Sequence, residues 1–188
     1  MLHRRTHPYT LPPSPVGIID YAGFPKDNFY YYLSRWGGDP LGNGTGPPVA
    51  HLLPHWNWEA DAHGSITNTS FPGRVWVHTN CEEAELFVNG ISLGRKRLQI
   101  VNTTQRNDHK PSVTQHIEWN STDNIAYQRG ALKVVAYRGG QAVVTNTIKT
   151  AGAPHAVLLS VDFGSTLEMN GQDVALIRAT IIDADGAY

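Results

Sequence analysis

Short runs of alternating apolar and polar residues follow one another along the middle of the chain, and they predict β-strands. The runs cover residues 74–79, 84–88, 91–93, 116–119, 132–137 and 142–148. Asn89-Gly90 and Gly139-Gly140 each separate two runs, and both dipeptides favour two-residue hairpins because the central residues need positive φ. Six or seven short strands with turns between them indicate an immunoglobulin-like antiparallel β-sandwich over about residues 50–150.

One helix is predicted before these strands, at residues 24–36. Phe29, Leu33 and Trp36 recur at helical spacing and form an apolar stripe. Such a helix needs a body to pack on, yet residues 1–16 before it are proline-rich, which predicts a disordered segment. We therefore expect the stripe to lack its natural partner in this chain and the helix to be weakly protected against amide exchange.

Segments rich in glycine and proline divide the chain. The predicted regions are a disordered proline-rich segment at 1–16, a helix region at 17–38, a linker at 39–49, a sandwich at 50–150 and a partial second sandwich at 151–188. Apolar runs at 156–161 and 174–182 predict the first strands of that last region. Its roughly 35 residues are too few for a sandwich, which takes about 100, so we expect a truncated domain.

The composition argues against two classes of partner. A net charge of −1 and a pI near 6.7 provide no basic patch for nucleic acid. No run approaches the ~20 apolar residues of a membrane helix, so we expect neither nucleic acid nor membrane as a partner. Cys81 is the one cysteine, which leaves no intrachain disulfide, and we expect it to be a small residue beside a strand.

Four N-glycosylation sequons begin at Asn43, Asn68, Asn102 and Asn120. Chance gives about 1.5 sequons in a chain of this composition, and all four fall in predicted loops. The excess predicts a secreted, extracellular glycoprotein. Residues 1–16 contain no apolar segment of the kind that a signal peptide needs, so this localisation depends on the sequons alone.

Three motifs, in this order, resemble glycoside hydrolase family 2, the β-galactosidase-like enzymes. They are residues 17–36 (GIIDYAGFPKDNFYYYLSRW), 51–58 (HLLPHWNW) and 85–95 (ELFVNGISLGR). The resemblance covers about residues 17–188. It implies that residues 17–38 are the strand end and last helix of a catalytic (β/α)8 barrel, and that the rest is the immunoglobulin-like region after it. The implied partner is therefore a barrel missing from this chain, with a carbohydrate substrate only in that context.

Retaining glycosidases use two carboxyl groups about 5–5.5 Å apart. In the family both are glutamates on barrel strands, and no glutamate of this chain matches those positions: Glu59, Glu82, Glu83, Glu85, Glu118 and Glu168. We therefore assign no catalytic residue and expect the chain to be inactive alone. Ligand-like spacing is also missing from the histidines His51, His55, His63 and His78, and we predict neither a metal site nor a cofactor.

Trp56, Asn57 and Trp58 are the candidate residues for contact with a sugar or with a neighbouring domain. Two tryptophans separated by one residue point to the same face of an extended strand. Their rings could stack on a sugar while Asn57 or His55 reaches its hydroxyl groups. Alternatively, both tryptophans wedge between barrel and sandwich, because large aromatic side chains dominate such packing.

Three functions remain open. The leading hypothesis is a non-catalytic C-terminal part of a β-galactosidase-like glycosidase, whose sandwiches support the barrel that hydrolyses O-glycosidic bonds. The alternative is a stand-alone secreted carbohydrate-binding or adhesion module, motivated by Trp56 and Trp58. A truncated product without activity is the third. In each case the predicted fold is mainly β: an immunoglobulin-like β-sandwich preceded by one orphan barrel helix and followed by a partial second sandwich.

Overall fold

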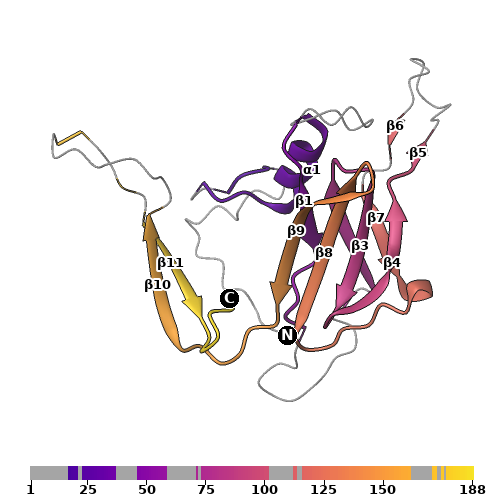
Figure 1. Cartoon of the computed structure of the whole chain (residues 1–188). Helices are drawn as coiled ribbons and strands as arrows, with labels where there is room; N and C mark the ends of the chain where they lie inside the picture. The colour runs from indigo at the N-terminus through magenta and orange to yellow at the C-terminus, as the bar shows by residue number, and fades with distance from the viewer. Residues whose placement is uncertain are drawn as a thin grey trace, which may run out of the picture.

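The computed structural model describes residues 17–20, 23–36, 46–58, 71, 73–101, 112–113, 116–161, 171–172, 175 and 177–188. Within these residues the protein is mainly β, as the sequence predicts, and has one α-helix (Figure 1). The elements are α1 (Asp27–Trp36), β1 (Ala50–Leu53), β2 (Arg74–Thr79), β3 (Glu83–Val88), β4 (Ile91–Arg97), β5 (Ile100–Val101), β6 (Ser112–Val113), β7 (Ile117–Asn120), the 3-10 helix η1 (Ser121–Asp123), β8 (Ala131–Arg138), β9 (Gln141–Lys149), β10 (Ala156–Val161) and β11 (Ile177–Ile182). In the part of the chain described, no helix is long and apolar enough to cross a bilayer.

Two antiparallel sheets form the main body, a β-sandwich. One has the strand order β1-β2-β7 and the other β4-β3-β8-β9. Three strands opposite four is the arrangement of a constant-type immunoglobulin domain. At one edge the two sheets are joined by Asn146 of β9, whose side-chain amide donates a hydrogen bond of 3.0 Å to the carbonyl of Ala50 in β1.

The core lies between these sheets and comes from every second residue of their strands. Val75 and Val77 of β2 are fully buried in one cluster with Leu86 of β3 and Leu132 of β8. Burying one such side chain contributes roughly 1.5–3 kcal/mol. Side chains alternate between the two faces of a strand. The residues that alternate with these buried ones therefore point outward, away from the core.

Both predicted hairpins are confirmed. Asn89-Gly90 connects β3 to β4, and the two residues have φ of 48° and 83°. Gly139-Gly140 connects β8 to β9, with φ of 53° and 81°. Positive φ at both central residues is the requirement of a type I′ turn, whose twist matches that of the flanking strands. These dipeptides therefore set the register of the two hairpins.

Helix α1 packs on the outer face of the three-stranded sheet, at β1 and β2. Tyr30 stacks on His51 with ring centroids 3.8 Å apart and planes within 8° of parallel. Tyr31 meets His78 edge to face at 5.6 Å. Ser34, one turn further along the helix, is fully buried. The expectation that the helix has no partner in this chain is therefore wrong.

The face of the helix that makes this contact also differs from the predicted one. Phe29 and Leu33 are only half-buried, and Trp36 is 79% exposed. Helical spacing identifies the apolar stripe correctly but says nothing about partners elsewhere in the chain. Here the aromatic partners are histidines on the sheet, so the tyrosine side of the helix turns inward.

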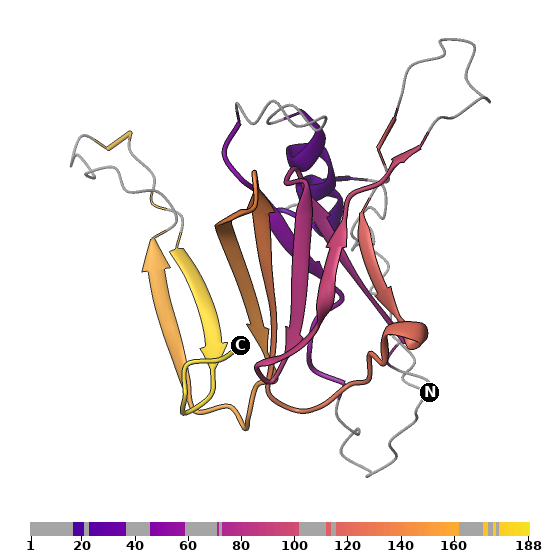
Figure 2. The same cartoon turned by 45° about the vertical axis from the view of Figure 1, so that its right-hand side comes forward.

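The β10–β11 hairpin lies beside β9 and outside the two sheets of the sandwich (Figures 1 and 2). One of its faces is apolar and exposed, formed by Val157, Leu159, Val161, Ile177, Ala179 and Ile181. The Asp183 carboxylate fixes the base of the hairpin by accepting hydrogen bonds from the backbone N–H groups of Gly152, Ala187 and Asp185, at 2.7, 2.8 and 2.9 Å. The bonds from Gly152 and Ala187 are the main cause of a lowered pKa of Asp183.

Candidate functional site

Polar and aromatic side chains form rows across the outer face of the three-stranded sheet. Val75 and Val77 of β2 point into the core, so Arg74, Trp76 and His78 point outward. The register places His78 opposite His51 of β1. It places Trp76 opposite Leu53 on one side and opposite Glu118 of β7 on the other. The face therefore has a histidine row and, next to it, a tryptophan row.

The histidine row consists of His51, His78 and His116. The rings of His51 and His78 are parallel within 7° at 6.5 Å, and His116 meets His78 edge to face at 6.2 Å. Helix α1 covers the β1 side of this row through Tyr30 and Tyr31 and through Asp27, whose carboxylate lies 2.8 Å from Nε2 of His51.

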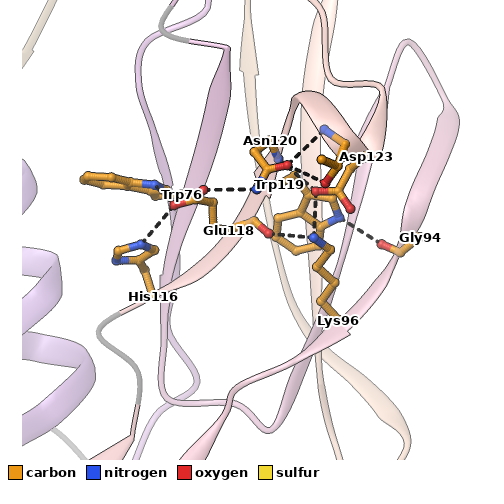
Figure 3. Close-up of polar contacts among 9 residues, drawn as sticks. Trp76, Gly94, Lys96, His116, Glu118, Trp119, Asn120 and Asp123 are labelled. Carbon is orange, nitrogen blue, oxygen red and sulfur yellow. Dashed lines mark hydrogen bonds and ion pairs between the residues drawn. The ribbon is translucent and has the colours of Figure 1, made fainter. Parts of the chain in front are cut away.

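The tryptophan row consists of Leu53, Trp76 and Glu118, which lie opposite one another on β1, β2 and β7. The Trp76 ring stacks on His116 at 4.3 Å, and its Nε1–H donates a hydrogen bond of 2.7 Å to Glu118 (Figure 3). The guanidinium of exposed Arg74 lies 5.7 Å from the centroid of the Trp76 ring. Together with Leu53 and Pro54, these two residues line a pocket of about 360 Å³ that is open to solvent.

A second group of contacts ties β7 to β4 at the edge of the sandwich (Figure 3). Asn120 caps η1, and Asp123 accepts a hydrogen bond of 2.8 Å from the Asn120 backbone N–H. Lys96 of β4 donates to Asp123 at 2.7 Å and to the Glu118 carbonyl at 2.9 Å. The Trp119 ring lies 5.6 Å from the Lys96 ammonium, and its indole N–H donates to the Gly94 carbonyl at 3.3 Å. This group holds the two sheets in register at the edge opposite Asn146.

The two carboxylates in these networks stay ionised. Burial raises the pKa of Glu118, but hydrogen bonds from Trp76, Asn120 and His116 outweigh it, and the net pKa is lowered. Burial likewise raises the pKa of Asp123, while Lys96 and the Asn120 backbone N–H lower it by more. A general acid at neutral pH needs a raised pKa. We therefore assign Glu118 and Asp123 to the support of the sheet.

The structure separates the three residues of the predicted sugar or domain contact. Strand β1 ends at Leu53, so Trp56 and Trp58 do not lie on one strand. Trp56 is 1% exposed, belongs to the core and donates a hydrogen bond of 3.0 Å to the Gln128 carbonyl. It is therefore not available to a sugar. Trp58 is half-buried and stacks on His55 at 4.3 Å.

Asn57 is exposed, and its side chain binds the linker after β9. Its Oδ1 accepts a hydrogen bond of 2.7 Å from the backbone N–H of Ala151. Thr150, which precedes Ala151, donates from Oγ1 to the Trp56 carbonyl at 2.7 Å. The motif thus fixes the start of the linker between the sandwich and the β10–β11 hairpin. A contact of Asn57 or Trp58 with a sugar or with another domain stays a prediction.

Asn120 is the one predicted sequon asparagine within the described residues, and its amide has structural partners. Oδ1 accepts hydrogen bonds from the Thr122 backbone N–H at 3.0 Å and from the Thr122 hydroxyl at 2.6 Å. Nδ2, the atom to which a glycan would be attached, donates to Glu118 at 3.3 Å. Asn43, Asn68 and Asn102 lie outside the described residues.

The remaining candidates from the sequence occupy ordinary structural positions. Glu83 and Glu85 lie on the outer face of β3, where Glu83 pairs with Arg95 and Arg97 and Glu85 accepts hydrogen bonds from Ser92 and Tyr137. Cys81 is buried. Among the described residues, no group of three or more His, Cys, Asp or Glu could hold a metal ion. Glu59, His63 and Glu168 lie outside the described part.

Sequence reasoning missed Arg74, Trp76 and His116. The signal for the first two was present, because both alternate with Val75 and Val77 and so belong to the face opposite the core. Their proximity to His116, forty residues after Trp76, depends on the pairing of β2 with β7, which no local pattern specifies.

Residues 72–144 match a family described as a domain of unknown function (DUF4982). Beta-galactosidase BoGH2A of Bacteroides ovatus is 34% identical over 185 residues, which cover 95% of this chain and 17% of that protein. A putative beta-glucuronidase of Formosa agariphila is 32% identical over 148 residues, 77% of this chain and 11% of that protein.

Solved structures agree. The crystal structure of a glycosyl hydrolase family 2 member from Bacteroides cellulosilyticus has a TM-score of 0.60 and 26% identity over 92% of this chain and 22% of that one. The chain thus spans less than a quarter of the length of each of these proteins. This chain corresponds to a limited part of each of its homologues. By sequence and by fold, these homologues are β-galactosidase- and β-glucuronidase-type members of glycoside hydrolase family 2.

Proposed function

We propose that this chain is the non-catalytic C-terminal part of a β-galactosidase-like family 2 glycosidase, whose sandwich supports a catalytic barrel that precedes Gly17. The barrel hydrolyses O-glycosidic bonds and is the natural partner of this chain. The region after residue 150 begins a second immunoglobulin-like domain, in which the exposed apolar face of β10–β11 is covered by further strands.

The observation that carries the proposal is the docking of α1. Its sequence resembles the last helix of the family's barrel, and it packs on the sandwich through Tyr30 and Tyr31. A barrel that contains this helix would meet the sandwich at the same face. The exposed Trp36 leaves apolar surface on the opposite side of the helix for the rest of the barrel.

A hydrolysis assay tests the non-catalytic part of the proposal. We expect the purified chain to release no nitrophenol from nitrophenyl β-galactoside, β-mannoside or β-glucuronide. Glu118→Gln and its surface counterpart Glu83→Gln serve as a matched pair of variants. Turnover by the chain that disappears in one carboxylate variant and persists in the other would contradict the proposal.

The supporting role needs a second experiment. A family 2 catalytic barrel joined in frame before Gly17 should melt at a higher temperature than the same barrel without this chain, because docking stabilises both parts. Tyr30→Ala should remove part of that gain. Equal melting temperatures with and without the chain would contradict the supporting role.

We also propose that the protein is secreted. Glycosylation of its sequons tests this part of the proposal. Mass spectrometry of the protein from a eukaryotic secretory host would detect it. Because Asn120 holds its amide in a cap, we expect that sequon to be occupied less than the other three. The alternative of a stand-alone carbohydrate-binding module loses one of its two original motives, because Trp56 lies in the core.

A further inference from the structure

We propose that the pocket beside Trp76 binds an acidic monosaccharide, a sugar ring that carries a carboxylate. The pocket lies between the end of β1, at Leu53 and Pro54, and the start of β2, at Arg74 and Trp76. Its volume of about 360 Å³ is within the 300–1,000 Å³ that is usual for small-molecule sites. Three of its four lining residues are apolar or aromatic and the fourth is a cation, which is the composition of a ligand site with one orienting group.

The aromatic wall of the pocket is held in place before any ligand arrives. The Trp76 ring rests on His116 at 4.3 Å, and its Nε1–H is bound to Glu118 at 2.7 Å. The N–H is therefore not free for a ligand, and recognition by Trp76 must use the ring. The electron-rich face of an indole attracts the C–H groups of a sugar ring. Because the pocket is open, the hydroxyl groups of such a ring would remain in water.

The charge at the pocket selects an acidic ligand. Arg74 is exposed, its guanidinium lies over the Trp76 ring at 5.7 Å, and within the described residues it has no ion pair and no hydrogen bond. A guanidinium offers five donors in a planar arrangement that fits a carboxylate. The nearest carboxylate of this row, Glu118, already accepts hydrogen bonds from Trp76, His116 and Asn120. A carboxylate from a ligand is thus the partner that Arg74 lacks.

The site lies wholly within this chain, so it does not depend on the proposed role in a larger enzyme. If that role holds, α1 covers the neighbouring histidine row, and the pocket borders the joint between barrel and sandwich. Small-molecule sites occur preferentially at such joints.

Isothermal titration calorimetry on the full chain tests the proposal with four probes. Glucuronate combines ring and charge, glucose supplies the ring alone, acetate supplies the charge alone, and cyclohexanecarboxylate is an acidic ring without hydroxyl groups. We expect glucuronate to bind at least tenfold more tightly than each of the other three. The preference over glucose should decrease at high salt, because an exposed charge is screened.

Variants then assign the binding to the pocket. Arg74→Ala should abolish the preference for glucuronate over glucose, and Trp76→Ala should weaken glucuronate at least tenfold. Lys133 lies over Phe87 at 5.8 Å on the other sheet, so Lys133→Ala and Phe87→Ala are matched controls that should leave binding unchanged. Circular dichroism verifies the fold of each variant.

Three results would overturn the proposal: no heat of binding with the folded wild-type chain, equal affinity for glucuronate and cyclohexanecarboxylate, or an unchanged preference in folded Arg74→Ala. None of them bears on the hydrolysis assay, so a failure of this site remains distinct from a failure of the proposed function.

Discussion

The two outer faces of the sandwich are built from different residues. The face of β1-β2-β7 has histidine and tryptophan rows, a covering helix and a pocket. The face of β4-β3-β8-β9 has a charged network in which Glu83 pairs with Arg95 and Arg97. Both sheets bury their other face in the same core.

Partners explain the difference. On the four-stranded sheet, Tyr137 donates a hydrogen bond of 2.9 Å to Glu85, and the Arg95 guanidinium lies 3.6 Å from the centroid of the Tyr137 ring. Long charged side chains can satisfy one another there while water covers them. On the three-stranded sheet, flat rings stack on rings supplied by α1. The outer face of the four-stranded sheet is therefore suited to solvent, and that of the three-stranded sheet to a covering element. The core residues, which both sheets share, do not indicate this difference.

The strongest test of this contrast is the removal of His51. His51→Ala deletes the stack with Tyr30 and the contact with Asp27, and we expect a loss of about 2 kcal/mol in the free energy of docking. A free helix of ten residues is marginal in water, so undocked α1 should unfold. Hydrogen exchange should then accelerate about thirtyfold at its amides.

Phe87→Ala on the other face is the matched control. It should leave the exchange of α1 unchanged, because Phe87 lies on the four-stranded sheet, whereas α1 packs on β1 and β2 of the other sheet. If α1 exchanged freely already in the wild-type chain, the helix would be undocked in solution and the contrast between the faces would fail.

The alternation of residues explains how much of this could be predicted. β2, β3, β8 and β9 were expected within one or two residues, because each combines period-two apolar residues with a turn signal. β1 was missed because its four residues, AHLL, are too short for a period to be visible. The β10–β11 pair was also expected, whereas its role as the start of a second domain remains a prediction.

The candidate site was harder to predict than the fold. Trp56 was placed with Trp58 on one face because an extended strand was assumed through both. Instead the chain leaves the strand after Leu53, and Trp56 enters the core, where its partner Gln128 is 72 residues away. The pairs Tyr30–His51 and Trp76–His116 likewise join residues that only the folded chain brings together. Local spacing identifies exposed aromatic residues, but not the rings that they contact.

A smaller effect on stability comes from one glutamate on each face, Glu118 on the three-stranded sheet and Glu83 on the four-stranded sheet. These two glutamates allow a sharper comparison of the faces. The hydrogen bonds to Glu118 lower its folded-state pKa in spite of burial, and a hydrogen bond from Arg97 is the first cause of the lowered pKa of Glu83. A lowered pKa means that the ionised group stabilises the fold above the ordinary glutamate pKa of about 4.3. That stabilisation is lost as the pH falls through the lower folded-state pKa.

Salt should distinguish the two glutamates. We expect Glu118→Gln to cost about 1–2 kcal/mol at pH 7 and Glu83→Gln about 0.5–1 kcal/mol, with both differences disappearing in acid. Urea unfolding at low salt and in 1 M NaCl measures them. Glu83 binds exposed arginines, so its effect should vanish in salt. Glu118 binds the neutral donors Trp76 and Asn120 in addition to His116, so it should keep most of its effect. Equal salt sensitivity would contradict the contrast between the faces.

The smallest expected effect comes from a feature that the two faces share, an exposed cation over an aromatic ring. Arg74 over Trp76 and Lys133 over Phe87 are both exposed cations beside a ring, at 5.7 and 5.8 Å. Exposed pairs of this kind contribute about 0.5–1 kcal/mol, part of which is offset by the entropy of holding a long side chain. We therefore expect Arg74→Ala and Lys133→Ala each to change the free energy of unfolding by no more than about 0.5 kcal/mol in urea titrations. A much larger loss for Arg74→Ala would mean that Arg74 holds the sheet together, and its guanidinium would then not be free for a ligand.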